Sequence, residues 1–172
     1  ASDQRGLFFG QRGPTGVQRI QPEQRLAGGM AHPVERQRHF LAEQLRLLQS
    51  LAERHKQEYA VVAMDIDNLK QVNDTFGHEM GDLALRGFAN VLRKTSRGSD
   101  VGVRTGGDEF LVLLPRGGLS DAKVLAGRVR DAMAALGRSE PHTAITLSFG
   151  VAAWRPGRTA EQVLEAADAM LY

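Results

Sequence analysis

The sequence contains no cysteine, which excludes disulfide bonds and thiolate metal sites. Aromatic residues are scarce, at 6% of the 172 residues, and there is a single tryptophan. No apolar run approaches the roughly 20 residues that a membrane-spanning helix needs, and no signal-peptide pattern is present. We therefore expect a cytoplasmic protein with no membrane contact from this chain. Its start at Ala1 is compatible with the cytoplasmic part of a larger sensor protein.

A strong net charge is also lacking, because 22 basic residues are set against 20 acidic ones. The small excess lies in residues 1–32, where four arginines face only Asp3 and Glu23. Taking these away leaves 18 basic and 18 acidic residues in the rest of the chain. A neutral body without a basic stripe laced with aromatic residues argues against DNA or RNA as a partner.

The chain divides by composition into a tail and one domain. Residues 1–32 are rich in Gly, Gln and Arg, contain Pro14 and Pro22, and show no sustained hydrophobic period. We interpret them as a flexible N-terminal tail or linker. Residues 33–172 have the length of one ordinary domain that can bury a hydrophobic core.

Hydrophobic periodicity predicts helices and strands within that domain. Leucines and Ala52 recur at spacings of three and four in the first helix, and the run at 59–64 is continuous, as in a buried central strand. Five aromatic residues are assigned to core packing: Phe76, Phe88, Phe110, Phe149 and Trp154. The predicted helices are 34–56, 83–92, 119–136 and 160–172, and the predicted strands are 59–64, 101–104, 110–114 and 145–153.

The second and third strands are separated only by residues 105–109, which include Gly106 and Gly107. This short glycine connection predicts a β-hairpin. The order of elements, with a hairpin in the middle, predicts an α+β fold in which helices pack on a mainly antiparallel sheet.

Acidic residues gather at two comparable places. Asp65 and Asp67 stand where the first strand ends, and Asp108 and Glu109 stand in the hairpin turn. If the strands are neighbours, these carboxylates converge, and clustered oxygen ligands without His or Cys are what Mg²⁺ prefers. Such a site suits phosphoryl transfer. Taken one at a time, Asp65, Asp67 and Asp108 are more typical of turns and helix caps than of a metal site.

Two longer motifs surround these acids. Residues 64–82, MDIDNLKQVNDTFGHEMGD, resemble the DxDxFKxxNDxxGHxxGD segment of diguanylate cyclases. Residues 104–110, RTGGDEF, match the RxGGDEF signature of that family's GGDEF domain. Further along, SFG at 148–150 resembles the family's S-x-G strand, and ADAMLY at 167–172 resembles its AD-x-A-x-Y helix. The resemblance covers residues 33–172.

The resemblance implies a palm-like fold, ferredoxin-related and nucleotidyl-cyclase-like, with a mainly antiparallel central sheet flanked by helices and a signature hairpin. Each domain of this family binds one GTP, so two domains must meet as a homodimer. On that pattern Asp65 and Asp108 would coordinate Mg²⁺, or Mn²⁺ in its place, by carboxylate. Ile66 would contribute its backbone carbonyl.

The same resemblance implies a substrate-binding set. Asn73 and Asp82 would read the guanine edge, and a site built in this way rejects bases that leave its polar groups unpaired. His78 would lie near the nucleotide, although after a glycine it could equally cap a turn. Gly106 and Gly107 lack side chains, so the backbone can approach phosphate closely.

Catalytic roles fall on three residues of the motifs. Lys70 would place positive charge on the phosphates, although most lysines are simply solvated. Glu109, or Asp108 itself, would help to deprotonate the attacking 3′-hydroxyl. Arg104 could pair structurally with a neighbouring acid, and its place in the site is weakly indicated.

An RxxD pair stands before the second strand. Arg97 and Asp100 have the spacing of the family's inhibitory site, with five residues between Asp100 and Gly106. Arg97 can fork onto guanine or phosphate and Asp100 can accept from guanine, so the pair suits binding of cyclic di-GMP, the product. The alternative is an ordinary loop that ends a helix, and the two interpretations are compatible.

The family pattern breaks at both ends. Its opening DxLTGLxNRxxF motif is reduced to little more than Phe40, which puts the orientation of the first helix in doubt. The chain stops at Tyr172, where the family continues with a phosphate-binding lysine and arginine, so we expect the C-terminal end to be truncated. Leu69 replaces the usual phenylalanine, a mild packing change.

These observations favour an enzyme, a Mg²⁺-dependent homodimeric diguanylate cyclase. It would condense two GTP into cyclic di-GMP and pyrophosphate, with product feedback inhibition at the RxxD site. The alternative is a catalytically weak or inactive GGDEF domain that acts as a cyclic di-GMP receptor. The intact hairpin signature favours the enzyme, and the altered ends favour the receptor.

Overall fold

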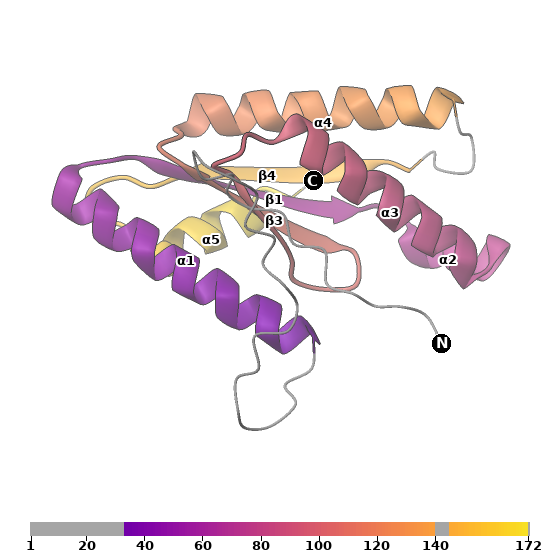
Figure 1. Ribbon diagram of the computed structural model, residues 1–172, viewed down its shortest axis with the longest axis horizontal. Coiled ribbons are helices and arrows are strands. Elements are labelled where there is room, and N and C mark those ends of the chain that lie inside the picture. The colour runs from indigo at the N-terminus through magenta and orange to yellow at the C-terminus, as the bar shows by residue number, and fades with distance from the viewer. Residues whose placement is uncertain (1–32, 140–144, 172) are drawn as a thin grey trace.

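The computed structural model describes residues 33–139 and 145–171, so the predicted tail at 1–32 lies outside the described residues. Within them, helices pack around a central sheet (Figure 1). The elements are α1 (Pro33–His55), β1 (Tyr59–Ile66), α2 (Leu69–Phe76), α3 (His78–Thr95), β2 (Val101–Arg104), β3 (Glu109–Pro115), α4 (Leu119–Ser139), β4 (Leu147–Ala153) and α5 (Ala160–Asp168).

The sheet has the strand order β2-β3-β1-β4, and each neighbouring pair is antiparallel. The predicted antiparallel α+β fold is therefore confirmed. β2 and β3 form the predicted hairpin, with Arg104 opposite Phe110. β1 lies between β3 and β4, so the strand that carries Asp65 is the direct neighbour of the signature hairpin.

The central strand β1 is buried on both faces, which explains its continuous apolar run. Alternate residues enter two separate cores because successive side chains of a strand point to opposite faces. Val62 and Met64 join the core under α3 and α4, and Val61 and Ala63 join the core under α1 and α5. The helices thus cover the sheet from both sides (Figure 1).

The predicted helix 83–92 begins earlier, at His78, and a separate short helix, α2, precedes it. The sequence analysis did not predict α2, which is only eight residues long and in which Leu69 is the only buried residue. Gly77 separates the two helices with φ of 87°, a backbone conformation that favours glycine. Phe76, at the end of α2, is 68% exposed, so its assignment to the core was wrong.

The C-terminal motifs pack against each other. A Cβ added to Gly150 of β4 would clash with the carbonyl group of Ala167 in α5. The glycine of SFG and the helix of ADAMLY therefore belong to one close strand–helix contact. A capping box starts α5, since Gln162 N–H donates to Thr159 Oγ1 and Thr159 N–H donates to Gln162 Oε1. The helix ends at Asp168, earlier than the predicted 172.

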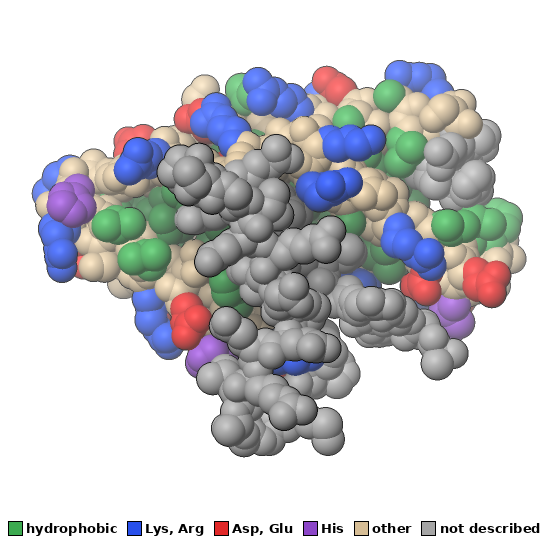
Figure 2. Space-filling model, viewed as in Figure 1, with side chains coloured by type: hydrophobic (Ala, Val, Ile, Leu, Met, Phe, Trp, Pro, Cys, Tyr) green, Lys and Arg blue, Asp and Glu red, His purple; other side chains and the backbone are tan. Residues whose placement is uncertain are grey.

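The visible face of the molecule carries both charge signs. Lys and Arg side chains are interrupted by acidic, apolar and uncharged groups on the parts that Figure 2 shows in colour. No helix within residues 33–139 and 145–171 combines the length and apolar character needed to cross a membrane.

Candidate active site

The end of β1 and the hairpin turn meet at one end of the sheet. Asp65 stands opposite Glu109 in the β1–β3 register, and Ile66 N–H donates to the carbonyl of Asp108 at 3.1 Å. On the other edge of β1, Asp65 stands opposite Ser148 of β4. The expected convergence of the two acidic groups is therefore a consequence of strand pairing.

The electrostatics of Asp65 reflect this convergence. Burial raises the pKa of Asp65 above its ordinary value, and repulsion by Asp108, Glu109 and Asp67 raises it further. A carboxylate crowded by other carboxylates is stabilised by a bound cation. The site therefore has the negative potential and the oxygen ligands that suit a hard divalent metal ion.

The predicted metal ligands are two carboxylates, of Asp65 and Asp108, and the backbone carbonyl of Ile66. Within the described ranges, no three His, Cys, Asp or Glu side chains are grouped closely enough to hold an ion by themselves. A site with two carboxylates, one carbonyl and water or phosphate oxygens does not need such a group, because Mg²⁺ usually keeps several non-protein ligands. The donor chemistry fits Mg²⁺.

Asp67 has a structural partner that the sequence did not indicate. Ser148 Oγ donates to Asp67 Oδ1 at 2.7 Å, and Asp67 N–H donates to the carbonyl of Thr146 at 3.0 Å. Thr146 directly precedes β4 and Ser148 lies in it. Asp67 is thus tied to the start of β4, next to Asp65 and its partner Glu109 in the β1–β3 ladder.

The two glycines of the turn differ in their surroundings. A Cβ on Gly106 would lie 2.5 Å from Glu109 Oε2, so the Glu109 carboxylate folds over this residue. A Cβ on Gly107 would meet nothing within 4 Å. The backbone N–H groups of Thr105 and Gly106 donate to the carbonyl of Glu109 and close the turn. Open space therefore adjoins Gly107.

The side chain of Arg104, the last residue of β2, contacts the backbone of this turn. It donates from Nε to the carbonyl of Gly106 at 3.1 Å and from Nη2 to that of Gly107. Its guanidinium carbon lies 5.8 Å from the centre of the Phe110 ring. The sequence suggested an acidic partner for Arg104, but its hydrogen bonds go to backbone carbonyls.

The predicted guanine-reading residues lie on α2 and α3. The Asn73 side chain packs directly on the backbone of buried Gly81, where a Cβ would clash with Asn73 Oδ1. Gly81 is followed by Asp82, which is partly buried, so Asn73 and Asp82 are brought to the same junction. His78 and Lys70 are exposed, at the start of α3 and in α2. All four roles stay predictions.

The RxxD pair lies at the opposite end of β2 from the turn. Asp100 is only 3% exposed, and its Oδ2 accepts from Arg97 N–H at 2.7 Å. Burial raises the pKa of Asp100, and the bond to Arg97 N–H opposes this. Arg97 Nη2 donates to Asp121 Oδ1 at 3.0 Å, and Gly118 N–H donates to Asp121 Oδ2 at 3.1 Å. The pair thus organises a loop, and its ligand-binding role stays a prediction.

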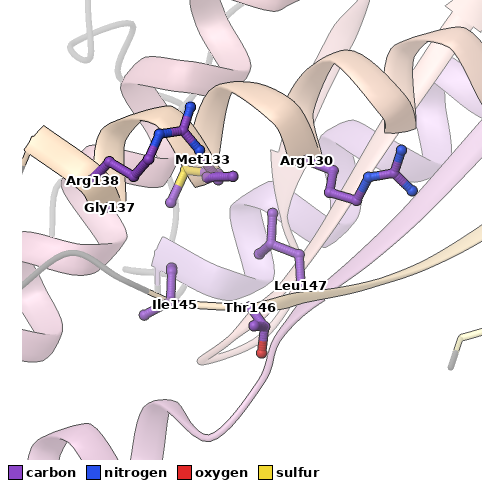
Figure 3. A pocket seen from close by; sticks show the side chains of 8 residues that line it. Arg130, Met133, Gly137, Arg138, Ile145, Thr146 and Leu147 are labelled. Carbon is purple, nitrogen blue, oxygen red and sulfur yellow. The ribbon is translucent and has the colours of Figure 1, made fainter. Parts of the chain in front are cut away.

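A separate pocket of about 490 Å³ opens between α4 and the start of β4 (Figure 3). Arg130 and Arg138 flank apolar groups that include Met133 and Leu147. None of the predicted site residues lines this pocket, so it is distinct from the candidate active site.

Comparison with known proteins places these motifs in a family. The family model described as diguanylate cyclase, GGDEF domain, matches residues 36–172. Diguanylate cyclase DgcP of Pseudomonas aeruginosa is 41% identical over 132 residues, which cover 74% of this chain and 20% of DgcP. Response regulator PleD of Caulobacter vibrioides is 36% identical over 140 residues, which cover 78% of this chain and 31% of PleD. The chain thus spans less than a third of the length of either relative.

Two solved structures show the same fold. The GGDEF domain of DgcB from Caulobacter crescentus, in complex with c-di-GMP, aligns with a TM-score of 0.70 and 31% identity, covering 77% of this chain and 80% of that one. The active GGEEF domain of a diguanylate cyclase from Vibrio cholerae aligns with a TM-score of 0.73 and 29% identity, covering 78% of this chain and 86% of that one. Both motifs lie at one end of the expected sheet, in agreement with the family model and the relatives. The chain therefore belongs to the GGDEF family of diguanylate cyclases.

Proposed function

We propose that this domain condenses two GTP molecules into one cyclic di-GMP and two pyrophosphates, using Mg²⁺ or Mn²⁺. The observation that carries the proposal is the alignment of Asp65 with Glu109 across the β1–β3 ladder, with Asp108 hydrogen-bonded to Ile66. Relatives that are named diguanylate cyclases support it, as does the c-di-GMP complex of the DgcB domain.

The metal-binding residues in this proposal are Asp65 and Asp108, with the carbonyl of Ile66. When bound, the ion neutralises charge on the phosphates. Lys70 adds a positive charge from α2. The exposed carboxylate of Glu109, next to Asp108, accepts the proton of the attacking 3′-hydroxyl, with Asp108 as the alternative base.

The nucleotide itself is held at two places. Asn73 and Asp82 bind the guanine edge where α2 meets α3, with His78 nearby, and the Gly106–Gly107 turn receives the phosphates. Each 3′-hydroxyl must attack the α-phosphate of the other GTP and displace its pyrophosphate, so one domain with one GTP is insufficient. We therefore propose a homodimer that brings two sites face to face, with residues 1–32 as a linker before each domain.

Incubation of the protein with GTP and Mg²⁺, followed by chromatography of the nucleotides, tests this function. We expect cyclic di-GMP and pyrophosphate from GTP, and no cyclic product from ATP. Asp108→Ala should abolish the product and leave the circular dichroism spectrum unchanged, because Asp108 lies in a turn outside both cores. Binding of cyclic di-GMP with no turnover by the native protein would contradict the enzyme and support the receptor alternative.

The same protein can be titrated with GTP and ATP to test base recognition. Asn73→Ala and Asp82→Ala should each weaken GTP binding much more than they weaken stability. Equal affinity of the native protein for GTP and ATP would show that the guanine assignment is wrong.

A further inference from the structure

Arg104 at the end of β2 donates hydrogen bonds to the backbone of the hairpin turn. A guanidinium presents its N–H groups in a rigid planar fork, and in this structure the fork engages the carbonyls of both Gly106 and Gly107. Two carbonyls on one fork fix the relative rotation of two successive peptide groups. A glycine pair needs such a restraint, because glycine is the residue with the widest choice of backbone conformations.

The restraint leaves backbone donors available in the turn. The N–H groups of Thr105 and Gly106 donate to the carbonyl of Glu109. Those of Gly107 and Asp108 have no acceptor among the residues that the structure describes. Open space adjoins Gly107, since a Cβ there would meet nothing within 4 Å. Unused backbone donors beside open space suit an anionic group such as phosphate.

Arg104 is itself fixed by its surroundings. It packs against the Phe110 ring, and it is partly buried. Burial lowers the pKa of the guanidinium, while the charges of Asp82 and Asp108 act in the opposite direction. Arg104 thus lies within electrostatic reach of both the proposed guanine-binding acid and the proposed metal ligand.

We propose that Arg104 is a positioning residue for the cyclase reaction. It holds the Gly106–Gly107 turn in the conformation that presents Asp108 and the unused N–H groups to the triphosphate. It acts through the turn and does not contact the nucleotide. This inference rests on the proposed function, but its first consequence, a changed turn, is measurable without any substrate.

The test uses Arg104→Gln and Arg104→Lys, with Arg86→Gln as the matched control, because Arg86 is exposed on α3 and lies outside the site. Amide chemical shifts of Gly106, Gly107 and Asp108 are measured by NMR in the nucleotide-free protein. Guanosine affinity and the kcat and KM for GTP are then measured. Guanosine reports on the base site alone because it carries no phosphate.

We expect both Arg104 variants to shift the turn amides and to lower kcat by roughly ten- to a hundredfold, the cost of a small misplacement of reacting groups. Guanosine affinity should not change. Arg104→Lys should keep more of the native rate than Arg104→Gln but not all of it, because lysine keeps the charge but lacks the planar pair of N–H donors. Arg86→Gln should leave all three measurements unchanged.

Two outcomes would overturn the proposal. Unchanged turn amides with a lowered kcat would mean that Arg104 contacts the nucleotide directly. A loss of guanosine affinity as large as the loss in kcat/KM would mean that it acts through Asp82. If the native protein makes no cyclic di-GMP, the proposed function fails, but the amide shifts still decide whether Arg104 holds the turn. If Arg104→Gln does not fold, the same measurements on Arg104→Lys alone decide the proposal.

Discussion

Ser148 and Asp67 are 81 residues apart in sequence, yet Ser148 Oγ donates a hydrogen bond of 2.7 Å to Asp67 Oδ1. The bond joins the start of β4 to the residue that follows β1. It holds one of the three carboxylates that raise the pKa of Asp65. The charge distribution of the site therefore depends on a serine that lies outside the acidic motifs.

Ser148→Ala should destabilise the domain by about 1 to 2 kcal/mol, because it removes a hydrogen bond to a charged, partly buried group. Urea unfolding of the native and variant proteins measures this difference. Ser50→Ala is the control, since Ser50 is exposed on α1 and should change stability little. Equal stability of native and Ser148→Ala proteins would show that the bond contributes nothing.

Gly150→Ala should lower the free energy of unfolding by about 1 to 3 kcal/mol. The added methyl group would clash with the backbone of Ala167 and force β4 and α5 apart. Gly127→Ala is the matched control. A Cβ there meets nothing within 4 Å in the middle of α4, so alanine should stabilise that helix by up to about 1 kcal/mol. Opposite shifts in melting temperature would confirm both environments, and a stable Gly150→Ala protein would contradict the close contact.

Asp65→Asn should raise the melting temperature at neutral pH while abolishing cyclase activity. Burial and the neighbouring carboxylates raise the pKa of Asp65, so its ionised form destabilises the folded state. This cost is absent below the ordinary pKa of a carboxyl group and develops as the pH rises through the raised pKa. The gain in melting temperature should therefore become smaller as the pH falls.

Melting curves of native and Asp65→Asn protein across that pH range provide the measurement. Asp74→Asn, at an exposed position of α2, serves as the control and should give no such pH-dependent gain. An Asp65→Asn protein that is less stable than the native one at neutral pH would contradict the electrostatic account.

Arg97→Ala should weaken cyclic di-GMP binding by roughly ten- to a hundredfold, the value of one charge-assisted pair. The loss should not come from unfolding, because the Arg97–Asp121 pair is exposed and such pairs contribute little. Calorimetric titration of cyclic di-GMP into the native and Arg97→Ala proteins measures it, with Arg93→Ala as the control because Arg93 is an exposed arginine in the last turn of α3. If Arg97→Ala binds as tightly as the native protein, the pair is an ordinary loop.

Sequence patterns sufficed where one physical signal dominated. The strand Val101–Arg104 was predicted with its observed bounds, and the apolar run at 59–64 correctly marked the central strand. The hairpin followed from two glycines between two apolar runs. The meeting of the acidic groups could be expected as soon as β1 and β3 were taken as neighbours, because strand pairing fixes it.

Other features depend on contacts that no local pattern contains. α2 was missed although Leu69, Val72 and Phe76 are spaced as on one helical face, because a helix of eight residues is too short for its period to stand out. Phe76 was misassigned because hydrophobicity alone does not say whether a partner surface exists. The bond from Ser148 to Asp67 and the fork of Arg104 on two carbonyls follow from tertiary placement, which spacing in the sequence does not reveal.

The burial of β1 on both faces has a mechanical consequence. A strand that is paired along both edges and packed on both sides cannot slide or tilt without breaking two ladders and two cores together. Asp65 at its end is thus attached to a strand that is held on both edges and both faces. In the proposed enzyme, a signal that changed the reaction rate would have to act where the structure can yield, at the hairpin turn, at the junction of α2 and α3, or in how the two proposed protomers approach each other.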